Sequence, residues 1–197
     1  MNQDIRIRPI HDGDWDAIVA LEAATYTDGE LSEERAALES RGRVAPGTSF
    51  VLERERRLLG YVLALPYPVD RYPDLSRAEH RAHRSRNLHL HDLVIAPGAR
   101  GRRLGTRLLA HLTATAAAKG YERISLVAVG GAHTFWAAHG FAAHPGIALP
   151  TGYGPDAHYM SSTVPEHPSG TVPGHRSEES KPVSDLSPGS PSEDEVG

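Results

Sequence analysis

Apolar and polar positions along most of this chain follow two repeating patterns, which predict a domain that mixes strands with helices. Apolar residues at every second position indicate half-buried strands, and apolar residues three or four apart indicate amphipathic helices. Strands are predicted at Ile5–Pro9, Ser49–Arg54, Leu58–Pro66, His89–Ile95 and Arg123–Val129, with a closing hairpin from Phe141–Ala143 and Ala157–Thr163. Helices are predicted at Trp15–Glu22, Ser32–Ser40, Arg103–Lys119 and Ala132–His139. The fold class is therefore α/β, of the mixed α+β kind.

Capping residues mark the ends of the predicted helices. Asp12 or Asp14 is expected to cap the first helix, because a short acidic side chain there accepts a hydrogen bond from an unpaired backbone N–H. The second helix is expected to stop at Gly42, and Gly120 is expected to end the third as a C-cap. One face of that third helix is expected to pack in the core, and it carries Leu104, Leu108, Leu112 and Thr115.

The last 33 residues, 165–197, differ in composition from the rest of the chain. They contain six Pro, four Gly and seven Ser, and their seven acidic residues outnumber two basic ones. A segment with so few apolar residues cannot offset the conformational entropy that ordering would cost. We therefore expect one domain at residues 1–164 and a disordered acidic tail at residues 165–197.

Composition excludes several other classes of protein. Because the chain has no cysteine, it has no disulfide framework, no thiolate metal site and no cysteine nucleophile. No pair among its 12 histidines has the spacing and carboxylate companions of a zinc site, so no catalytic metal is expected. The N-terminus has no signal-peptide pattern, and no apolar run approaches the ~20 residues that span a bilayer. We expect a cytoplasmic protein that does not contact membranes.

Residues 88–109 carry the most informative chemical pattern in the chain. They read as an apolar strand, a Pro-Gly break, a run of Arg and Gly, and then a helix. Such a turn directs unpaired N–H groups and the positive end of a helix dipole at one place, which favours an anion such as phosphate. The absence of Gly-Lys-Ser/Thr argues against a P-loop, and Gly101 and Gly105 lack the spacing of a dinucleotide fingerprint.

Two motifs in this chain resemble those of the GNAT N-acetyltransferase superfamily. The acetyl-CoA turn of that family reads Arg or Gln, two residues, Gly, one residue, then Gly or Ala. Here Arg100 and Gly105 take the first and last positions, and Arg103 stands where the first glycine is usual. The preceding residues 92–97 match in register. Residues 134–141, Thr-Phe-Trp-Ala-Ala-His-Gly-Phe, resemble the family's Phe-Tyr-x-x-x-Gly-Phe element.

This resemblance covers about residues 5–164 and implies a fold, a reaction and a cosubstrate. The implied fold is a mostly antiparallel central sheet flanked by helices, with one strand splayed from its neighbour at the acetyl-CoA site. The implied reaction transfers the acetyl group of acetyl-CoA to a primary amine of a small molecule, an amino acid or a peptide. The alternative is a non-catalytic acyl-CoA-binding module, which Trp136 and the Arg103 substitution motivate.

The resemblance also implies which residues hold acetyl-CoA. Backbone groups of Leu93, Val94 and Ile95 on the splayed strand are expected to hold the pantetheine arm. The pyrophosphate is expected on the amides of the turn, where arginine side chains add positive charge. The residues of the turn are Arg100, Gly101, Arg102, Arg103, Leu104, Gly105 and Thr106.

His91 is the candidate general base for the acceptor amine. In spermidine/spermine-type acetyltransferases a Glu stands just before the Asp of this strand, nine residues ahead of the first Arg of the turn. His91 has that position here. An imidazole titrates at ~6.5, so it accepts protons near neutral pH. The alternative bases are His89 and a chain of water molecules, or no protein group serves as the base. In each of these cases His91 would be a structural histidine of the strand.

The family commonly has a Tyr that protonates the coenzyme thiolate, and Trp136 stands at that position here. An indole N–H does not give up its proton near neutral pH, so Trp136 is expected to pack on the pantetheine. Tyr153, in a turn-rich segment before the last strand, is the candidate general acid, and Tyr26 is its alternative.

The resemblance implies that the acceptor groove is built from the loops Thr25–Glu34 and Pro66–Asn87. The second loop is rich in Arg and His, but its Asp and Glu residues dilute the charge, so nucleic acid is not expected as a partner. An acceptor that carries a carboxylate, or a solvated segment with ion pairs, explains this loop better. The expected partner is a small-molecule or peptide amine, and the expected oligomeric state is a monomer or a homodimer.

Overall fold

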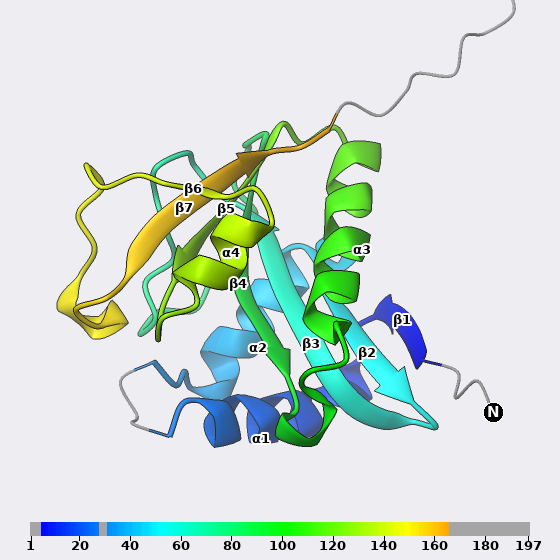
Figure 1. Cartoon of the computed structure of the whole chain (residues 1–197). Helices are drawn as coiled ribbons and strands as arrows, with labels where there is room; N and C mark the ends of the chain where they lie inside the picture. Colours follow the sequence, from blue (N-terminus) through cyan, green and yellow to red (C-terminus); the bar gives the residue numbers. More distant parts are fainter. Residues whose placement is uncertain (1–4, 28–30, 166–197) are drawn as a thin grey trace, which may run out of the picture. The chain divides into compact units, whose positions relative to one another are not determined.

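The computed structural model describes residues 5–27 and 31–165, which form seven strands and four α-helices (Figure 1). The strands are β1 (Ile5–Pro9), β2 (Phe50–Arg54), β3 (Arg57–Pro66), β4 (Asn87–Ile95), β5 (Arg123–Ala128), β6 (Ala142–Ala143) and β7 (His158–Thr163). The helices are α1 (Trp15–Thr25), α2 (Arg35–Val44), α3 (Leu104–Ala118) and α4 (His133–Ala138). Within these described ranges no helix is long and apolar enough to cross a membrane. The predicted tail, apart from Pro165, lies outside the described residues.

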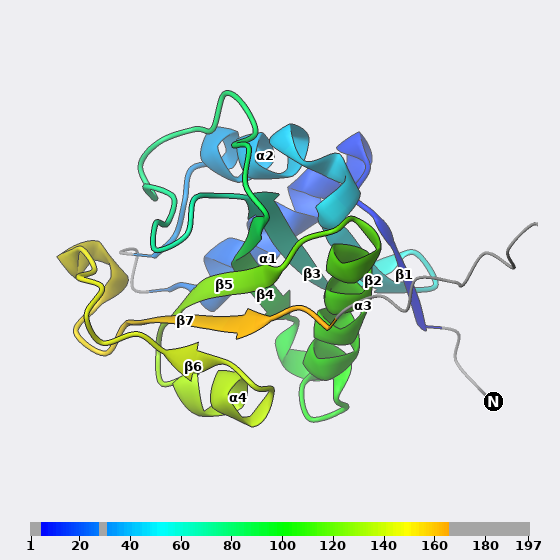
Figure 2. The same cartoon turned by 90° about the horizontal axis from the view of Figure 1, so that it is seen from above.

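All seven strands belong to one sheet, in the order β1-β2-β3-β4-β5-β7-β6. Only β4 and β5 run parallel, and they pair through just three residues each, Asn87–His89 with Arg123–Ser125. Beyond those pairs β4 stays beside β3, whereas β5 stays beside β7, as Figure 2 shows. The two parallel strands therefore diverge. The predicted fold class, a mostly antiparallel sheet with one splayed strand, is confirmed.

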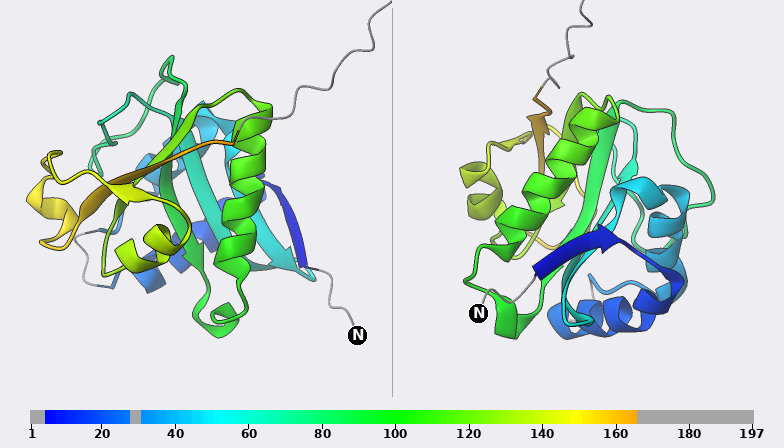
Figure 3. Two further views of the ribbon diagram at one scale, coloured as in Figure 1. Left: turned by 45° about the horizontal axis from the view of Figure 1, so that its top comes forward. Right: turned by 90° about the vertical axis from the view of Figure 1, so that its right-hand side faces the viewer.

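Two hydrophobic cores lie on opposite faces of this sheet. Helices α1 and α2 cover one face, and α3 and α4 cover the other (Figure 3). Successive residues of β3 serve the two cores in turn, because side chains alternate across a strand. Tyr61 and Leu63 pack with α1 and α2, whereas Val62 and Ala64 pack with α3. The sheet is thus buried on both faces at its centre.

The ends of α1 and α3 test the predicted caps. Asp14 does occupy the N-cap position of α1, but its carboxylate accepts the N–H of His11 at 2.8 Å and makes no cap bond to α1. Gly120 ends α3 as predicted, although the C-cap residue itself is Lys119. Gly120 follows it with a φ of +76° and donates its N–H to the Ala117 carbonyl at 3.1 Å. A left-handed glycine that satisfies a late helix carbonyl is a common helix ending.

The predicted position of the second helix was wrong. Helix α2 covers Arg35–Val44 instead of Ser32–Ser40, and Gly42 lies within it instead of ending it. A Cβ atom at Gly42 would lie 2.7 and 2.8 Å from two atoms of the Trp15 ring on α1. Glycine is therefore present because α1 and α2 approach each other closely, and it is not a stop signal.

The long connection between β3 and β4, residues 67–86, contains no strand or helix, and we call it the strap. Three of its residues are hydrogen-bonded to the C-terminal part of the sheet and its loops. The N–H of Asp70 donates to the Tyr159 hydroxyl at 3.1 Å. The Tyr72 hydroxyl donates to the Ala148 carbonyl at 2.8 Å. The carbonyl of Pro73 accepts the Tyr153 hydroxyl at 2.7 Å. The strap is thereby fixed beside the last strand.

We predict that Gly42→Ala destabilises the protein, although alanine is the better helix former. Overpacking against Trp15 costs about 1–3 kcal/mol, and over most of that range the cost exceeds the ~1 kcal/mol that alanine gains in a helix. Urea denaturation measures the difference. Gly13→Ala is the matched control, because a Cβ there meets nothing within 4 Å. Equal midpoints for both variants would show that the Trp15 ring adapts without cost.

Candidate functional site

A cleft of about 690 Å³ opens where β4 and β5 diverge. One wall is Leu90–Leu93 of β4, and Trp136 of α4 contributes to another. Leu75 of the strap and Tyr153 also line it, as do residues from the end of α1 and the segment after it. Beyond His89, no described strand pairs with the β5 side of β4. Backbone groups of β4 on that side are therefore free to bind an extended ligand.

The turn between β4 and α3 borders this cleft through Arg100. The turn starts with a 3₁₀ helix, η3 (Pro97–Ala99), and passes through Gly101 at a φ of +77° and Arg103 at +57°. Helix α3 then starts at Leu104. The first N–H groups of a helix have no partner inside it, and the helix dipole adds partial positive charge there. This is the anion-binding geometry that the sequence predicts.

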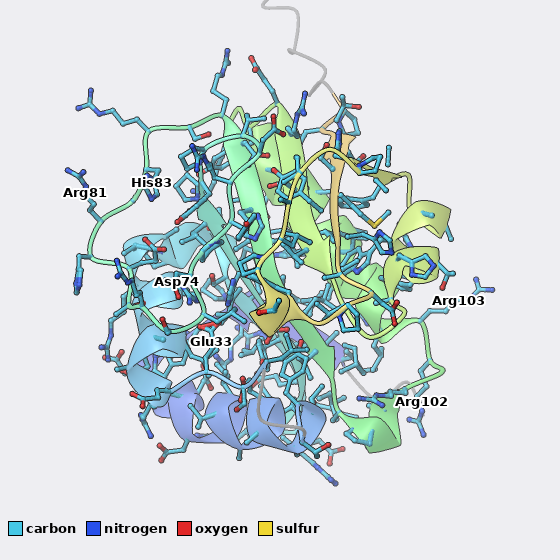
Figure 4. The ribbon with its side chains drawn as sticks, turned by 90° about the vertical axis from the view of Figure 1, so that its left-hand side faces the viewer. Glu33, Asp74, Arg81, His83, Arg102 and Arg103 are labelled. Atoms are coloured by element: carbon cyan, nitrogen blue, oxygen red, sulfur yellow. The ribbon has the colours of Figure 1, made fainter. Side chains whose placement is uncertain are left out.

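The arginine side chains of the turn differ in direction. Arg102 and Arg103 are exposed and project away from the ribbon, as Figure 4 shows. Arg100 instead donates from Nε to the Ile95 carbonyl at 3.2 Å, which ties the turn to the end of β4. At Gly105 an added Cβ would meet side-chain atoms of Leu93 and other residues no closer than 3.7 Å. The first turn of α3 therefore has room for one methyl group.

A β-bulge in β4 sets the direction of two polar side chains. Leu63 of β3 pairs with Asp92, but the next residue, Ala64, pairs with Leu90, so His91 has no opposite residue. An extra residue shifts the alternation of the strand. As a result, His91 and Asp92 are consecutive, yet both reach residues from the α1 and α2 side of the sheet.

His91 belongs to a buried chain of charged groups. Its Nε2 atom is hydrogen-bonded to Oε1 of Glu33, which lies between α1 and α2. The other oxygen of Glu33 accepts Nη2 of Arg41 at 2.6 Å and Nε at 2.8 Å. The side chains of His91, Glu33 and Arg41 are only 5%, 2% and 0% exposed. Arg41 also donates to the carbonyl of Asp74 in the strap at 2.9 Å.

These partners keep Glu33 ionised. Burial by itself would raise the pKa of its carboxyl group, but the charges and hydrogen bonds of His91 and Arg41 outweigh burial and hold that pKa below its usual range. A carboxylate in this state only accepts hydrogen bonds. Figure 4 shows Glu33 inside the molecule, between the helices and the strap residue Asp74.

Asp92 forms a second buried group beside His91. Its carboxylate accepts the Tyr26 hydroxyl at 2.8 Å and the Tyr61 hydroxyl at 2.5 Å. Burial raises the pKa of Asp92, although the two tyrosine hydrogen bonds and the neighbouring His91 oppose that shift. Burial also raises the pKa of Tyr26, and the negative charge of Asp92 raises it further. Tyr26 is therefore a hydrogen-bond donor to Asp92 at neutral pH.

The alternative base, His89, has a different environment. Its side chain is fully buried, and its Nδ1 lies 3.1 Å from the Ser125 hydroxyl of β5, at the last pair before the strands diverge. Burial lowers its pKa well below the usual histidine range. His89 is not among the residues that line the cleft, whereas His91 is.

Trp136 and Tyr153, the other two residues singled out in the sequence, both line the cleft. Trp136 is buried and packs edge-on against Phe135 and Phe141, with ring centroids 5.0 and 5.4 Å away. Tyr153 is buried and donates its hydroxyl proton to the Pro73 carbonyl. Burial raises the pKa of Tyr153, so its proton is held more firmly than in a free phenol.

Sequence reasoning missed Glu33 and Arg41. Both lie far from His91 in the chain, in a segment and a helix whose composition shows no unusual pattern. The bulge did leave a sequence signal that was overlooked. Residues 87–91 alternate polar and apolar, and Asp92 then breaks this alternation directly after His91, as an extra residue in a strand does. Among the described residues, no group of His, Asp and Glu is arranged to hold a metal ion.

Comparison with known proteins gives one family match and many structural matches. The model of the acetyltransferase (GNAT) family matches residues 15–141. The structure of N-acetylglutamate synthase from Neisseria gonorrhoeae, complexed with coenzyme A and N-acetyl-glutamate, is 21% identical, with a TM-score of 0.65. That match covers 84% of this chain and 36% of the synthase chain, so this chain spans about a third of that protein.

Two chains shorter than the synthase, one a whole protein and one a domain, match over almost their whole length. The ribosomal-protein-S18-alanine N-acetyltransferase from Escherichia coli is 14% identical, with a TM-score of 0.62, and the match covers 85% of this chain and 98% of that chain. The loading GNATL domain of CurA from Lyngbya majuscula is 17% identical, with a TM-score of 0.68. That match covers 82% of this chain and 98% of the CurA domain chain. Comparison with curated protein sequences gives no match. At these identities the structural matches show a shared fold.

We predict that Arg103→Gly is tolerated better than Arg102→Gly. A side chain at a left-handed φ costs about 1–2 kcal/mol, and glycine at position 103 removes that cost. Glycine at 102 relieves no positive φ and adds entropy to the unfolded chain, so it costs about 0.4–1 kcal/mol. Urea denaturation should therefore rank Arg103→Gly above Arg102→Gly by about 1 kcal/mol or more. Identical losses would mean that Arg103 is unstrained.

Proposed function

This chain belongs to the acetyltransferase (GNAT) family, and we propose that it transfers the acetyl group of acetyl-CoA to a primary amine. The observation that carries the proposal is one cleft lined by His91, by the part of β4 that has no partner on its β5 side, and by the turn residue Arg100. Such a cleft supplies an anion-binding turn, an open strand edge and a proton acceptor within one cavity. Acyl transfer from a thioester to an amine needs all three.

Acetyl-CoA is proposed to bind along β4 and the start of α3. The pyrophosphate is held by the amides of the turn from Gly101 to Thr106, with charge from Arg100, Arg102 and Arg103. The pantetheine arm is held by backbone groups of residues 93–95, which have no ladder partner on the β5 side. Support from known structures is that the synthase neighbour was crystallised with coenzyme A. Trp136 is proposed to pack against the arm, since it lines the cleft.

The proposed chemistry is direct attack of the amine on the thioester. The amine arrives mostly as an ammonium ion, and a base must remove a proton before its nitrogen can attack. The nitrogen then bonds to the carbonyl carbon, the carbon–sulfur bond breaks, and the coenzyme leaves as a thiolate. The nitrogen gives up its second proton in this step and the thiolate takes up one, so the net change is the one proton that the base removed from the ammonium ion. The amide product keeps one N–H. His91 is the proposed proton acceptor, because it lines the cleft and is hydrogen-bonded to a carboxylate.

Tyr153 is the proposed donor of the proton that the thiolate takes up. Its position in the cleft wall supports this role, but its proton is now donated to the Pro73 carbonyl. Delivery to sulfur therefore requires that hydrogen bond to break when substrates bind. The alternative donor, Tyr26, is engaged in the same way with Asp92. Trp136 keeps its proposed packing role, since an indole does not release its proton.

The proposed acceptors are amino acids, peptide N-termini and small primary amines. One structural neighbour is named for N-acetylglutamate and another for an alanine of a ribosomal protein. The segment around Glu33 and the strap border the cleft, so the acceptor contacts these segments in the proposed complex. Their side chains select the amine.

We predict that the protein releases thiol from acetyl-CoA only when a suitable amine is present. A panel of amines, amino acids and short peptides identifies the acceptor through the release of free coenzyme thiol. Gly105→Glu should abolish both thiol release and acetyl-CoA binding, because it adds bulk and negative charge beside the pyrophosphate. Gly105→Ala is the matched control and should keep binding, since its methyl group has room. Coenzyme binding without release for any amine would favour the binding-module alternative.

We predict that the pH profile of kcat/KM has an acid limb, because a base that already holds a proton cannot accept one from the amine. His91→Ala should remove that limb of the profile and lower the rate by about 10²–10⁴-fold, the usual contribution of one general base. His91→Gln keeps a hydrogen-bonding side chain without basicity. A Gln variant with the wild-type profile would assign His91 a structural role and direct the same test to His89.

A further inference from the structure

We propose that Glu33 is a positioning residue that fixes the tautomer of His91, so that Nδ1 is the atom that accepts the amine proton. This inference rests on the proposed function, because it refines the role of His91 in acetyl transfer. It starts from one hydrogen bond, between Nε2 of His91 and the carboxylate of Glu33.

The direction of that hydrogen bond follows from the charge of Glu33. Its carboxylate is paired with the buried Arg41 guanidinium at 2.6 and 2.8 Å, so it is ionised and only accepts. Nε2 of His91 must therefore carry the proton and donate it. In a neutral imidazole the other nitrogen then has the free lone pair. Nδ1 of His91 makes no hydrogen bond to any residue in the described part of the chain. It is the ring atom left for a substrate proton.

Arg41 keeps Glu33 in this state. Its guanidinium is fully buried, always charged, and bonded to the carboxylate through both Nη2 and Nε. A lone buried carboxylate would take up a proton and become a donor itself. Arg41 also reaches the strap, through the Asp74 carbonyl, and its Nη1 lies 3.7 Å from Glu79. The strap thereby helps to hold the arginine that holds Glu33.

The charged and titratable groups around His91 come from three elements. Glu33 and Arg41 approach from the α2 side, and Asp92 and His89 are its neighbours on β4. His89 has its ring centroid 6.4 Å away and is engaged with Ser125, and Asp92 is engaged with two tyrosines. Among these residues only Glu33 is bonded to the His91 ring. One residue therefore decides its tautomer.

Glu33→Gln tests this inference because it preserves shape and reverses the hydrogen bond. A glutamine amide has a single acceptor oxygen, and Arg41, which only donates, should take it. The NH₂ group then faces Nε2 of His91, which must accept, and the imidazole proton moves to Nδ1. The expected loss in kcat/KM is about 10²–10⁴-fold, the range for a base that is removed or held in the wrong tautomer. The KM for acetyl-CoA should not change.

The matched control is Glu39→Gln. Glu39 is also a carboxylate held by arginines, with Arg35 at 2.6 Å and Arg43 at 2.7 Å, but it does not contact His91. We expect its kcat/KM to stay within about twofold of wild type. On a His91→Gln background, Glu33→Gln should add no further loss, because a positioning residue acts only through the residue that it positions.

The tautomer itself is read from the ¹⁵N shifts of the imidazole in the free protein, with no acetyl-CoA or amine added. The His91 signals are assigned as those absent in His91→Gln. In the alkaline range where the His91 shifts no longer change with pH, wild type should show a protonated Nε2 and a bare Nδ1, and Glu33→Gln the reverse. The wild-type spectrum is already decisive, since a protonated Nδ1 there would overturn the inference even if Glu33→Gln failed to fold.

The two readouts separate the inference from the proposed function. If the protein transfers acetyl groups but the tautomer does not depend on Glu33, the positioning role is wrong and the function stands. If the tautomer switches as expected but transfer is unchanged, Glu33 does position His91, and His91 is not the base. A switch in tautomer together with the loss of transfer supports both.

Discussion

The pairing of β4 with β5 through only three residues each is the constraint on which the site depends. If the two strands stayed paired along their length, the β5 side of β4 would be used up by ladder hydrogen bonds and the cleft would not exist. Their divergence leaves the N–H and C=O groups of β4 open and makes room for a cavity. The bulge at His91 falls within the same splayed segment, so one strand provides both the open edge and the directed side chains.

The elements of the fold were predictable from the sequence because their signals are local. Alternation defined the strands, and a left-handed Gly120 ended α3 as expected. The position of α2 was predicted wrongly because its glycine is required by contact with a residue on another helix. Gly42 is next to Trp15 in space and 27 positions away in the chain, which no local pattern reveals.

In the candidate site, too, features with a local sequence signal were predictable and contacts between distant residues were not. The sequence singled out the turn from Arg100 to Gly105, together with His91 and Trp136. In the structure Arg100, His91 and Trp136 line one cleft. Glu33 and Arg41 were not found, because an ion pair between a loop and a helix leaves no periodicity and no spacing rule. The engagement of the Tyr153 hydroxyl with Pro73 depends on how two long loops meet, and it was equally invisible.

In the proposed complex the turn before α3 holds the coenzyme through peptide N–H groups, whereas side chains on the strap and on the segment around Glu33 contact the acceptor. Point mutations replace side chains and leave the peptide backbone in place. Point mutations would therefore change the side-chain end of the cleft more than the backbone end. Under the proposed function, substitutions would therefore change the acceptor more readily than the donor, and they would be least tolerated at the buried Arg41–Glu33 pair.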